Sequence, residues 1–169
     1  MRIYLIGYMG SGKSTVGKGL AAELNLSFID MDDYIEERNY KTIPRIFAED
    51  GEEVFRKLEQ KALHELSSFE NIVIATGGGA PCFFNNIEVI KQTGKSLYLK
   101  GTPRIIAERL RHSKIERPLI KGKTEEELVD FIDETLHKRE QWYNQADVVL
   151  EFDHNLSVKE VLSALKIQH

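Results

Sequence analysis

The sequence predicts an α/β fold built on a mainly parallel sheet, and three observations lead to that prediction. Short apolar runs alternate along the chain with segments of helical spacing, as in parallel strands joined by covering helices. A glycine-rich segment, Gly7–Thr15, directly follows the first apolar run. The length of 169 residues suits one domain, and no linker or internal repeat interrupts the sequence. We therefore expect a single domain over residues 1–169.

The expected strands are five short apolar runs, because runs of this length read as buried strands of a parallel sheet. They are Ile3–Ile6, Ser27–Ile29, Ile72–Ala75, Ser96–Leu99 and Val148–Leu150.

The expected helices lie between these runs. Val16, Leu20 and Leu24 recur every four residues, which places them on one helix face. Capping signals predict the starts of three further helices. These signals are Thr102-Pro103, before a helix reaching about Arg111, Thr124 with Glu127, and Ser157 with Glu160.

The charge balance and the cysteine count exclude several classes of protein. The chain carries 23 basic and 27 acidic residues, a net charge of −4. This balance does not supply the positive field of a protein that binds nucleic acid. A single cysteine excludes an internal disulfide framework and a thiolate zinc site, and it favours the reducing cytosol.

No segment has the hydropathy of a targeting or membrane-spanning sequence. The apolar run near the start, Ile3–Ile6, is shorter than the roughly 7–15 residues of a signal peptide or the roughly 20 of a membrane helix. We expect a cytoplasmic protein that binds no membrane. We also expect a monomer, because no exposed apolar stripe demands a partner.

The segment Gly7-Tyr8-Met9-Gly10-Ser11-Gly12-Lys13-Ser14-Thr15 fits the phosphate-loop pattern G-x-x-x-x-G-K-[ST] in full. Its glycines let backbone N–H groups point inward at a phosphate, and the following helix adds the positive end of its dipole. Lys13 would neutralise the β- and γ-phosphates, and the Ser14 hydroxyl would hold Mg²⁺. The predicted nucleotide-binding residues of the loop are Gly10, Ser11, Gly12, Lys13, Ser14 and Thr15, with ATP and Mg²⁺ as the ligands.

A phosphate loop alone leaves switch proteins, ATPases and small-molecule kinases open. Asp30 and Asp32 follow the second expected strand, and in extended backbone they would point to the same side. One carboxylate could order Mg²⁺ through water while the other accepts a hydroxyl proton. The alternative interpretation is a solvated acidic turn.

Two further segments suggest a substrate site, although each has a plainer interpretation. Arg56 could grip an anionic group bidentately, or it could form a surface ion pair with Glu59 three residues along a helix. The glycines of Gly77–Gly79 follow the third strand and are costly in chain entropy. Close approach of a ligand to their N–H groups would explain them better than a tight turn, which needs only one or two.

Two arginines complete the set of candidates. Arg117 lies in the polar stretch His112–Lys123, which is either a surface loop or a loop that closes over ATP and delivers an arginine to the developing charge. Arg139 continues the apolar stripe of a helix. It can extend its charged end to solvent, or it can face a pocket that contains an anion.

Together these segments resemble the shikimate kinase family, in order and over essentially the whole chain. The motifs that carry the resemblance are G-x-M-G-S-G-K-S-T at Gly7–Thr15, F-x-D-x-D at Phe28–Asp32, F-x-x-x-G-E-x-x-F-R-x-x-E at Phe47–Glu59, T-G-G-G at Thr76–Gly79, R-P-L at Arg117–Leu119 and R-x-x-x-Y-x-x-x-A-D at Arg139–Asp147.

The resemblance implies a P-loop NTPase fold of the nucleoside-monophosphate-kinase type. The expected sheet has five parallel strands in the order 2-3-1-4-5, with a substrate-binding subdomain at about 31–62 and a lid at about 112–124. The implied reaction transfers the γ-phosphate of ATP to the 3-hydroxyl of shikimate, a step towards chorismate and the aromatic amino acids.

The resemblance also implies a role for each candidate residue. Arg56 and Arg139 would bind the shikimate carboxylate, and Asp32 would bind the ring hydroxyls as the candidate base. The backbone of Gly77, Gly78 and Gly79 would contact the substrate, and Asp30 would support the Mg²⁺ shell through water. Arg117 would act from the lid. Arg109 and Arg111 compete for the position that stacks on adenine, and we select Arg111. The segment Glu151–Asn155 is expected to border the adenine.

Two other functions stay open at this point. A kinase of another polyol acid, such as gluconate, would share the fold but leaves Arg56 and the three glycines without an evident task. A nucleotide-dependent switch would turn over ATP or GTP regardless of shikimate. Such a switch usually carries a base-specificity motif, and no N-K-x-D occurs in the sequence.

Overall fold

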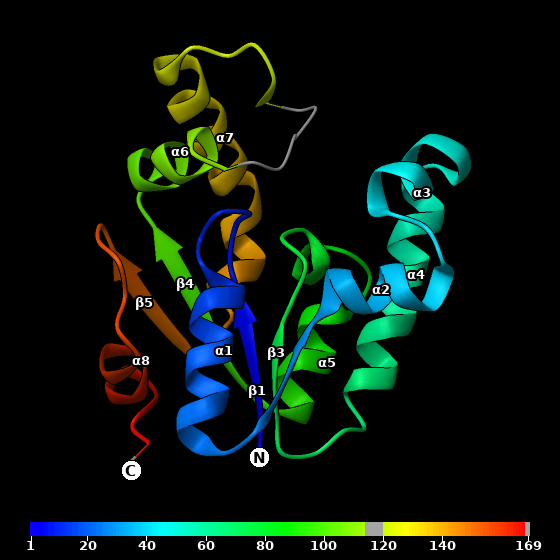
Figure 1. Cartoon of the computed structure of the whole chain (residues 1–169), viewed down its shortest axis with the longest axis vertical. Helices are drawn as coiled ribbons and strands as arrows, with labels where there is room; N and C mark the ends of the chain where they lie inside the picture. The colour runs from blue at the N-terminus through cyan, green and yellow to red at the C-terminus, as the bar shows by residue number, and fades with distance from the viewer. Residues whose placement is uncertain (114–119, 168–169) are drawn as a thin grey trace.

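The computed structural model describes residues 1–113 and 120–167. Within this part of the chain, five strands form one parallel sheet in the order β2-β3-β1-β4-β5 (Figure 1). The strands are β1 (Arg2–Ile6), β2 (Ser27–Asp30), β3 (Ile72–Ala75), β4 (Lys95–Gly101) and β5 (Val148–Phe152). The fold class, the five strands and their order are thereby confirmed.

Helices connect and cover the strands. They are α1 (Lys13–Leu24), α2 (Met31–Asn39), α3 (Ile43–Asp50), α4 (Glu52–Leu66), the 3₁₀ helix η1 (Ala80–Cys82), α5 (Asn86–Thr93), α6 (Pro103–Arg111), α7 (Glu125–Tyr143) and α8 (Val158–Leu165). In the described residues, no helix is long and apolar enough to cross a membrane.

The alternation of side chains along β1 explains how the sheet is buried on both faces. Tyr4 and Ile6 belong to an apolar cluster shared with α4, α5, α6 and α7. Ile3 and Leu5 belong to a second cluster, shared with α1 and α8. Since successive residues of a strand point to opposite faces, β1 contributes to both layers of the core and lies at the centre of the sheet.

The residues predicted to cap helices lie at the N-termini of α6, α7 and α8. The side chains of Thr102 and Thr124 accept hydrogen bonds from backbone N–H groups three residues along, in α6 and α7. Ser157 and Glu160 form a complete capping box at α8. These caps satisfy N–H groups that have no partner within a helix, so the ends of these helices are fixed by local sequence.

The carboxyl ends of the strands point towards the top of Figure 1, where the loop between β1 and α1 lies below α6. Ligands of open α/β sheets bind at this edge. The segments that follow β1, β2 and β3 contain the phosphate loop, Asp30 with Asp32, and Gly77–Gly79. The fold therefore brings these predicted site segments to one edge of the sheet.

Candidate active site

The phosphate loop connects β1 to α1 and depends on two glycines. Gly10 and Gly12 have φ angles of +79° and +90°, in the left-handed region that only glycine enters readily. Helix α1 starts directly afterwards at Lys13. The backbone thus curls around a helix N-terminus, which is a ready-made anion site.

The polar side chains of this loop suit a bound phosphate. Ser11 is 1% exposed, and its Oγ has no hydrogen-bond partner in the described part of the chain. Lys13 Nζ donates to the carbonyls of Gly7, at 2.5 Å, and Tyr8, at 3.0 Å, which keeps the ammonium group at the loop. Thr15 is exposed in the first turn of α1. A buried hydroxyl and a lysine at a helix start fit the phosphates of a nucleotide.

Ser14 and Asp30 lie together at the start of α1 and the end of β2. The Ser14 hydroxyl donates to Asp30 Oδ2, while Asp30 Oδ1 accepts from the backbone N–H groups of Asp32, at 2.9 Å, and Asp33, at 3.3 Å. Among the described residues, no group of three His, Cys, Asp or Glu side chains could hold a metal ion. A hydroxyl beside one carboxylate still fits Mg²⁺, which takes few protein ligands and completes its shell with water and phosphate oxygens.

Asp32 reaches the site from a helix and not from a strand. The expectation that Asp30 and Asp32 share extended backbone is wrong, because α2 begins at Met31 and Asp30 caps it. The two carboxylates nevertheless lie close enough to repel each other. Burial raises the pKa of Asp32 to about 6, with the charge of Asp30 adding to the rise and that of Lys13 opposing it. Asp32 therefore lies within electrostatic reach of the phosphate loop.

The three glycines after β3 make room for charged side chains of other elements. A Cβ on Gly77 would stand 2.7 Å from Glu59 Oε2 and 2.9 Å from Asp32 Oδ1. A Cβ on Gly79 would stand 2.6 Å from Arg56 Nη1. Real Cβ atoms do not approach other atoms this closely, so a side chain at either position would displace the charged ends of these neighbouring side chains.

Gly78 lies between the phosphate loop and α7. A Cβ at this position would be 3.4 Å from the backbone N of Met9 and 3.5 Å from Arg139 Nη1. The Gly77–Gly79 segment therefore lies directly beside Asp32, Arg56 and Arg139 as well as the phosphate loop. The structure brings these predicted site residues together.

Arg56 forms the ion pair that its helical spacing allows, but the pair is not a surface pair. Arg56 Nη1 lies 3.0 Å from Glu59 Oε1, and Nε lies 3.4 Å from Glu52 Oε1. The side chains of Arg56 and Glu59 are 13% and 1% exposed. Burial raises the pKa of Glu59 to about 7, against the opposing charge of Arg56. A buried pair of this kind is screened little by solvent and is costly to break.

Arg139 lies in α7 and is linked to the glycine segment through Tyr143. Its Nη1 lies 3.2 Å from Tyr143 Oη, and Tyr143 Oη donates to the carbonyl of Gly78. The guanidinium also lies 5.5 Å from the ring centre of Tyr8, in the phosphate loop. Arg139 thus faces the site and does not extend away from it.

The two arginines considered for the adenine position have different surroundings. Arg109 Nη1 donates to the carbonyl of Gly10, at 3.4 Å, and Nη2 donates to Asn155 Oδ1, at 3.1 Å. Its guanidinium lies 5.1 Å from the ring centre of Phe152. Arg111 is exposed and pairs with Glu125 at the start of α7, at 3.1 Å. Arg109 therefore joins the phosphate loop to the segment after β5, whereas Arg111 does not.

Arg117 lies outside the described residues, as does the part of the predicted lid at residues 114–119. Three residues that sequence reasoning did not assign also belong to the site. Glu59 and Tyr143 stand within the quoted motifs, so their spacing was available as a signal. Phe83, whose ring centre lies 4.0 Å from the Arg56 guanidinium carbon, carries no such signal.

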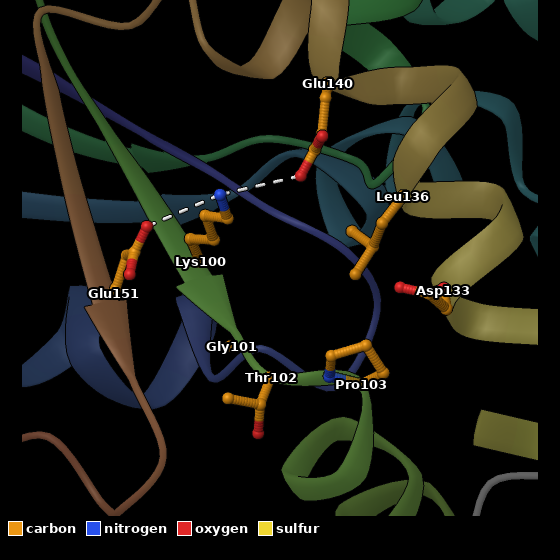
Figure 2. A pocket seen from close by; sticks show the side chains of 8 residues that line it. All are labelled: Lys100, Gly101, Thr102, Pro103, Asp133, Leu136, Glu140 and Glu151. Carbon is orange, nitrogen blue, oxygen red and sulfur yellow. Dashed lines mark ion pairs between the residues drawn. The ribbon is translucent and has the colours of Figure 1, made fainter. Parts of the chain in front are cut away.

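A cavity on the other side of β4 is separate from this site. Figure 2 shows its lining between β4, β5 and α7, with Lys100 placed between two glutamates. Lys100 Nζ lies 3.6 Å from Glu140 Oε1 and 3.4 Å from Glu151 Oε1. Of the residues predicted for the site, Glu151, the first residue of the segment expected to border the adenine, also lines this cavity, where it is paired with Lys100.

A phosphate loop beside a cluster of two arginines and two carboxylates is typical of a P-loop kinase for a small anionic acceptor. Comparison with known proteins identifies the family. Residues 9–167 match the model of the shikimate kinase family, and the chain belongs to that family, which consists of ATP-dependent kinases.

Individual relatives agree with this membership. The shikimate kinase of Azobacteroides pseudotrichonymphae is 51% identical over 165 residues, covering 97% of this chain and 96% of the relative. The crystal structure of shikimate kinase from Bacteroides thetaiotaomicron, at 47% identity, matches with a TM-score of 0.90 over 98% of this chain and 94% of that one. Shikimate kinase from Acinetobacter baumannii in complex with shikimate, at 37% identity, matches with a TM-score of 0.81 over 98% and 89%.

Proposed function

We propose that the site transfers the γ-phosphate of ATP to the 3-hydroxyl of shikimate, with the residue roles given below. The observation that carries the proposal is the contact of Asp32, Arg56 and Arg139 with the Gly77–Gly79 segment, directly beside the phosphate loop. Shikimate has one carboxylate and several hydroxyls. Two arginines suit the carboxylate, and a carboxylate side chain suits a hydroxyl.

On the nucleotide side, we assign the phosphates to the backbone of Gly10–Gly12 and to Lys13. Ser14 would bind Mg²⁺ directly and Asp30 through water, and the ion would neutralise phosphate charge when bound. For adenine we now favour Arg109 over Arg111, since Arg109 bridges the phosphate loop and Asn155.

On the acceptor side, Arg56 and Arg139 would bind the carboxylate and fix the ring. Asp32 would accept a hydrogen bond from the reacting hydroxyl and take its proton as the phosphoryl group is transferred. The N–H groups of Gly77, Gly78 and Gly79 would contact the substrate. Phosphoryl transfer asks the protein mainly for positioning and charge stabilisation, and these groups supply both.

The remaining assignments come from the family resemblance. Residues of about 31–62 would form the substrate-binding subdomain, and about 112–124 would form a lid that brings Arg117 to the transferred phosphoryl group. We further propose that the enzyme acts as a cytoplasmic monomer.

The test is a coupled ADP-release assay with Mg-ATP and either shikimate, gluconate or no acceptor. Turnover that depends on shikimate, with ADP and shikimate 3-phosphate formed in equal amounts, supports the proposal. Equal turnover with all three would contradict the acceptor assignment and favour a nucleotide-dependent switch, and turnover with gluconate alone would indicate another polyol-acid kinase.

A further inference from the structure

Arg56 is held on several sides by this chain, and one contact belongs to no recognised motif. Its guanidinium carbon lies 4.0 Å from the ring centre of Phe83 and 5.2 Å from that of Phe55. The Phe83 contact is the shortest cation–ring distance in the described residues. Phe83 is thus the closest aromatic neighbour of a residue assigned to the substrate carboxylate.

The segment that carries Phe83 is fixed by its own hydrogen bonds. The N–H of Cys82 donates to the carbonyl of Gly79, at 3.0 Å, and Asn86 Nδ2 donates to the carbonyl of Ala80, at 2.9 Å. Phe83 follows η1 in extended backbone, with a φ of −120°. The ring therefore starts from a constrained backbone and is half-buried, while Gly79 in the same segment leaves room for the guanidinium.

The edges of the guanidinium have different partners. Nε faces Glu52 and Nη1 faces Glu59. Within the described part of the chain, Nη2 makes no hydrogen bond. An aromatic ring over the flat face of a guanidinium attracts the cation and restricts its rotation, but it leaves the N–H groups in the plane free to donate.

We propose that Phe83 is a positioning residue for the acceptor carboxylate. Its ring holds the Arg56 guanidinium flat against Glu59, so that Nη2 is presented to the carboxylate of the substrate. This inference rests on the proposed function, because it needs Arg56 to bind that carboxylate. Without the ring, the long arginine side chain has other rotamers available, and fixing it costs free energy each time the substrate binds.

The first test is the Phe83→Leu variant, assayed with varied shikimate and saturating ATP. We expect the KM for shikimate to rise about tenfold, as for loss of a partly desolvated cation–ring contact. The kcat and the KM for ATP should change by less than about twofold, since uniform substrate binding is what is lost. Phe83→Tyr keeps the ring and should keep the KM near that of the unmodified enzyme.

The matched control is Phe84→Leu. Phe84 is the next residue and is 54% exposed, and it makes no ring contact with a cation in the described residues. Its substitution should leave all three kinetic constants unchanged. A fall in kcat and melting temperature for Phe83→Leu, with the KM for shikimate unchanged, would show a merely structural ring and overturn the proposal.

A double-mutant cycle with Arg56→Lys separates this inference from the proposed function. A lysine lacks the flat fork that stacks on the ring, so Phe83→Leu should have little further effect on the KM in that background. An equal effect in both backgrounds would overturn the positioning role. If Arg56→Lys itself leaves the KM unchanged, the carboxylate assignment fails. If it raises the KM while Phe83→Leu does not, only the role of Phe83 fails.

Discussion

The phosphate loop lies beside the proposed acceptor site, which contains Asp32, Arg56, Glu59 and Arg139, yet the two are built in different ways. The phosphate loop is one continuous segment whose shape comes from two left-handed glycines and a helix start. The proposed acceptor site is assembled from α2, α4, the Gly77–Gly79 segment and α7, and two of its charged side chains, Arg56 and Glu59, pair with each other. Backbone conformation thus makes the nucleotide site, whereas tertiary packing makes the acceptor site.

The two regions also differ in how their charges are balanced. Lys13 donates to two carbonyl groups of its own loop, which carry no net charge. In the proposed acceptor site, Arg56 is already paired with Glu59, and Asp32 lies near other carboxylates. A substitution in the loop should therefore lower phosphoryl transfer to any acceptor. A substitution in the acceptor site should mainly change the KM for shikimate.

The largest expected effect comes from Lys13→Ala. It removes the cation that we assign to the β- and γ-phosphates, and we expect kcat to fall by about 10³-fold or more. The steady-state ADP-release assay measures the loss, and circular dichroism checks that the fold is kept. Lys18→Ala, an exposed lysine of the same helix, is the control and should retain activity. Substantial turnover by Lys13→Ala would contradict the phosphate-loop assignment.

A similar loss in kcat is expected for Arg117→Ala, if the resemblance to the family's lid holds. An arginine that stabilises the charge of the transferred phosphoryl group contributes about 10³-fold to kcat. Because such an arginine acts in the transition state, the KM for shikimate should change much less than kcat. An unchanged kcat in the same assay would remove Arg117 from the catalytic residues.

This contrast in construction explains which parts of the molecule could be predicted from sequence. The strand–loop–helix conformation at Gly7–Thr15 could be predicted, since its glycines and helix start are local features of the sequence. All five strands were predicted, but β1, β2, β4 and β5 extend further than expected. Their polar end residues, among them Lys100 and Glu151, pair through the backbone despite side chains that do not resemble a buried strand. The strand order came from the family resemblance and not from the residue pattern.

In the proposed acceptor site, the sequence predicted most of the candidate residues but not the side chains that surround them. The spacing of Arg56 and Glu59 predicted an ion pair, but only packing against the Gly77–Gly79 segment buries it. Phe83 was missed because it approaches Arg56 from a different part of the chain. The choice between Arg109 and Arg111 depends on which side of α6 faces the phosphate loop, and tertiary contacts decide this.

The Arg139→Ala variant tests whether Arg139 affects the binding of shikimate and not that of ATP. Loss of a charged hydrogen-bonding partner of the carboxylate should raise the KM for shikimate by about 10- to 100-fold, with a smaller effect on the KM for ATP. Lys138→Ala is the matched control, because Lys138 is the preceding residue of α7 and its side chain is 75% exposed. Equal increases in both KM values would mean that Arg139 supports the whole site and not the acceptor carboxylate.

The smallest expected effect is a pH dependence of kcat/KM for shikimate that originates in Asp32. Burial raises the pKa of Asp32 from 3.8 to about 6, and only the ionised carboxylate can accept the hydroxyl proton. As the pH rises through this pKa, kcat/KM for shikimate should rise and then level off. Below it, activity should fall about tenfold per pH unit, so that the enzyme at pH 5 is about tenfold less active than on the plateau.

Glu59 titrates close by, with a pKa of about 7, and must be separated from Asp32. Glu59→Gln removes this second group but leaves Asp32 in place. If Asp32 is the base, the variant retains a rise in kcat/KM with pH, although its KM for shikimate is increased by the loss of the Arg56 partner. The profile is measured with saturating ATP and low shikimate between pH 5 and 8. A flat profile in the unmodified enzyme would contradict a proton acceptor whose pKa is raised to about 6.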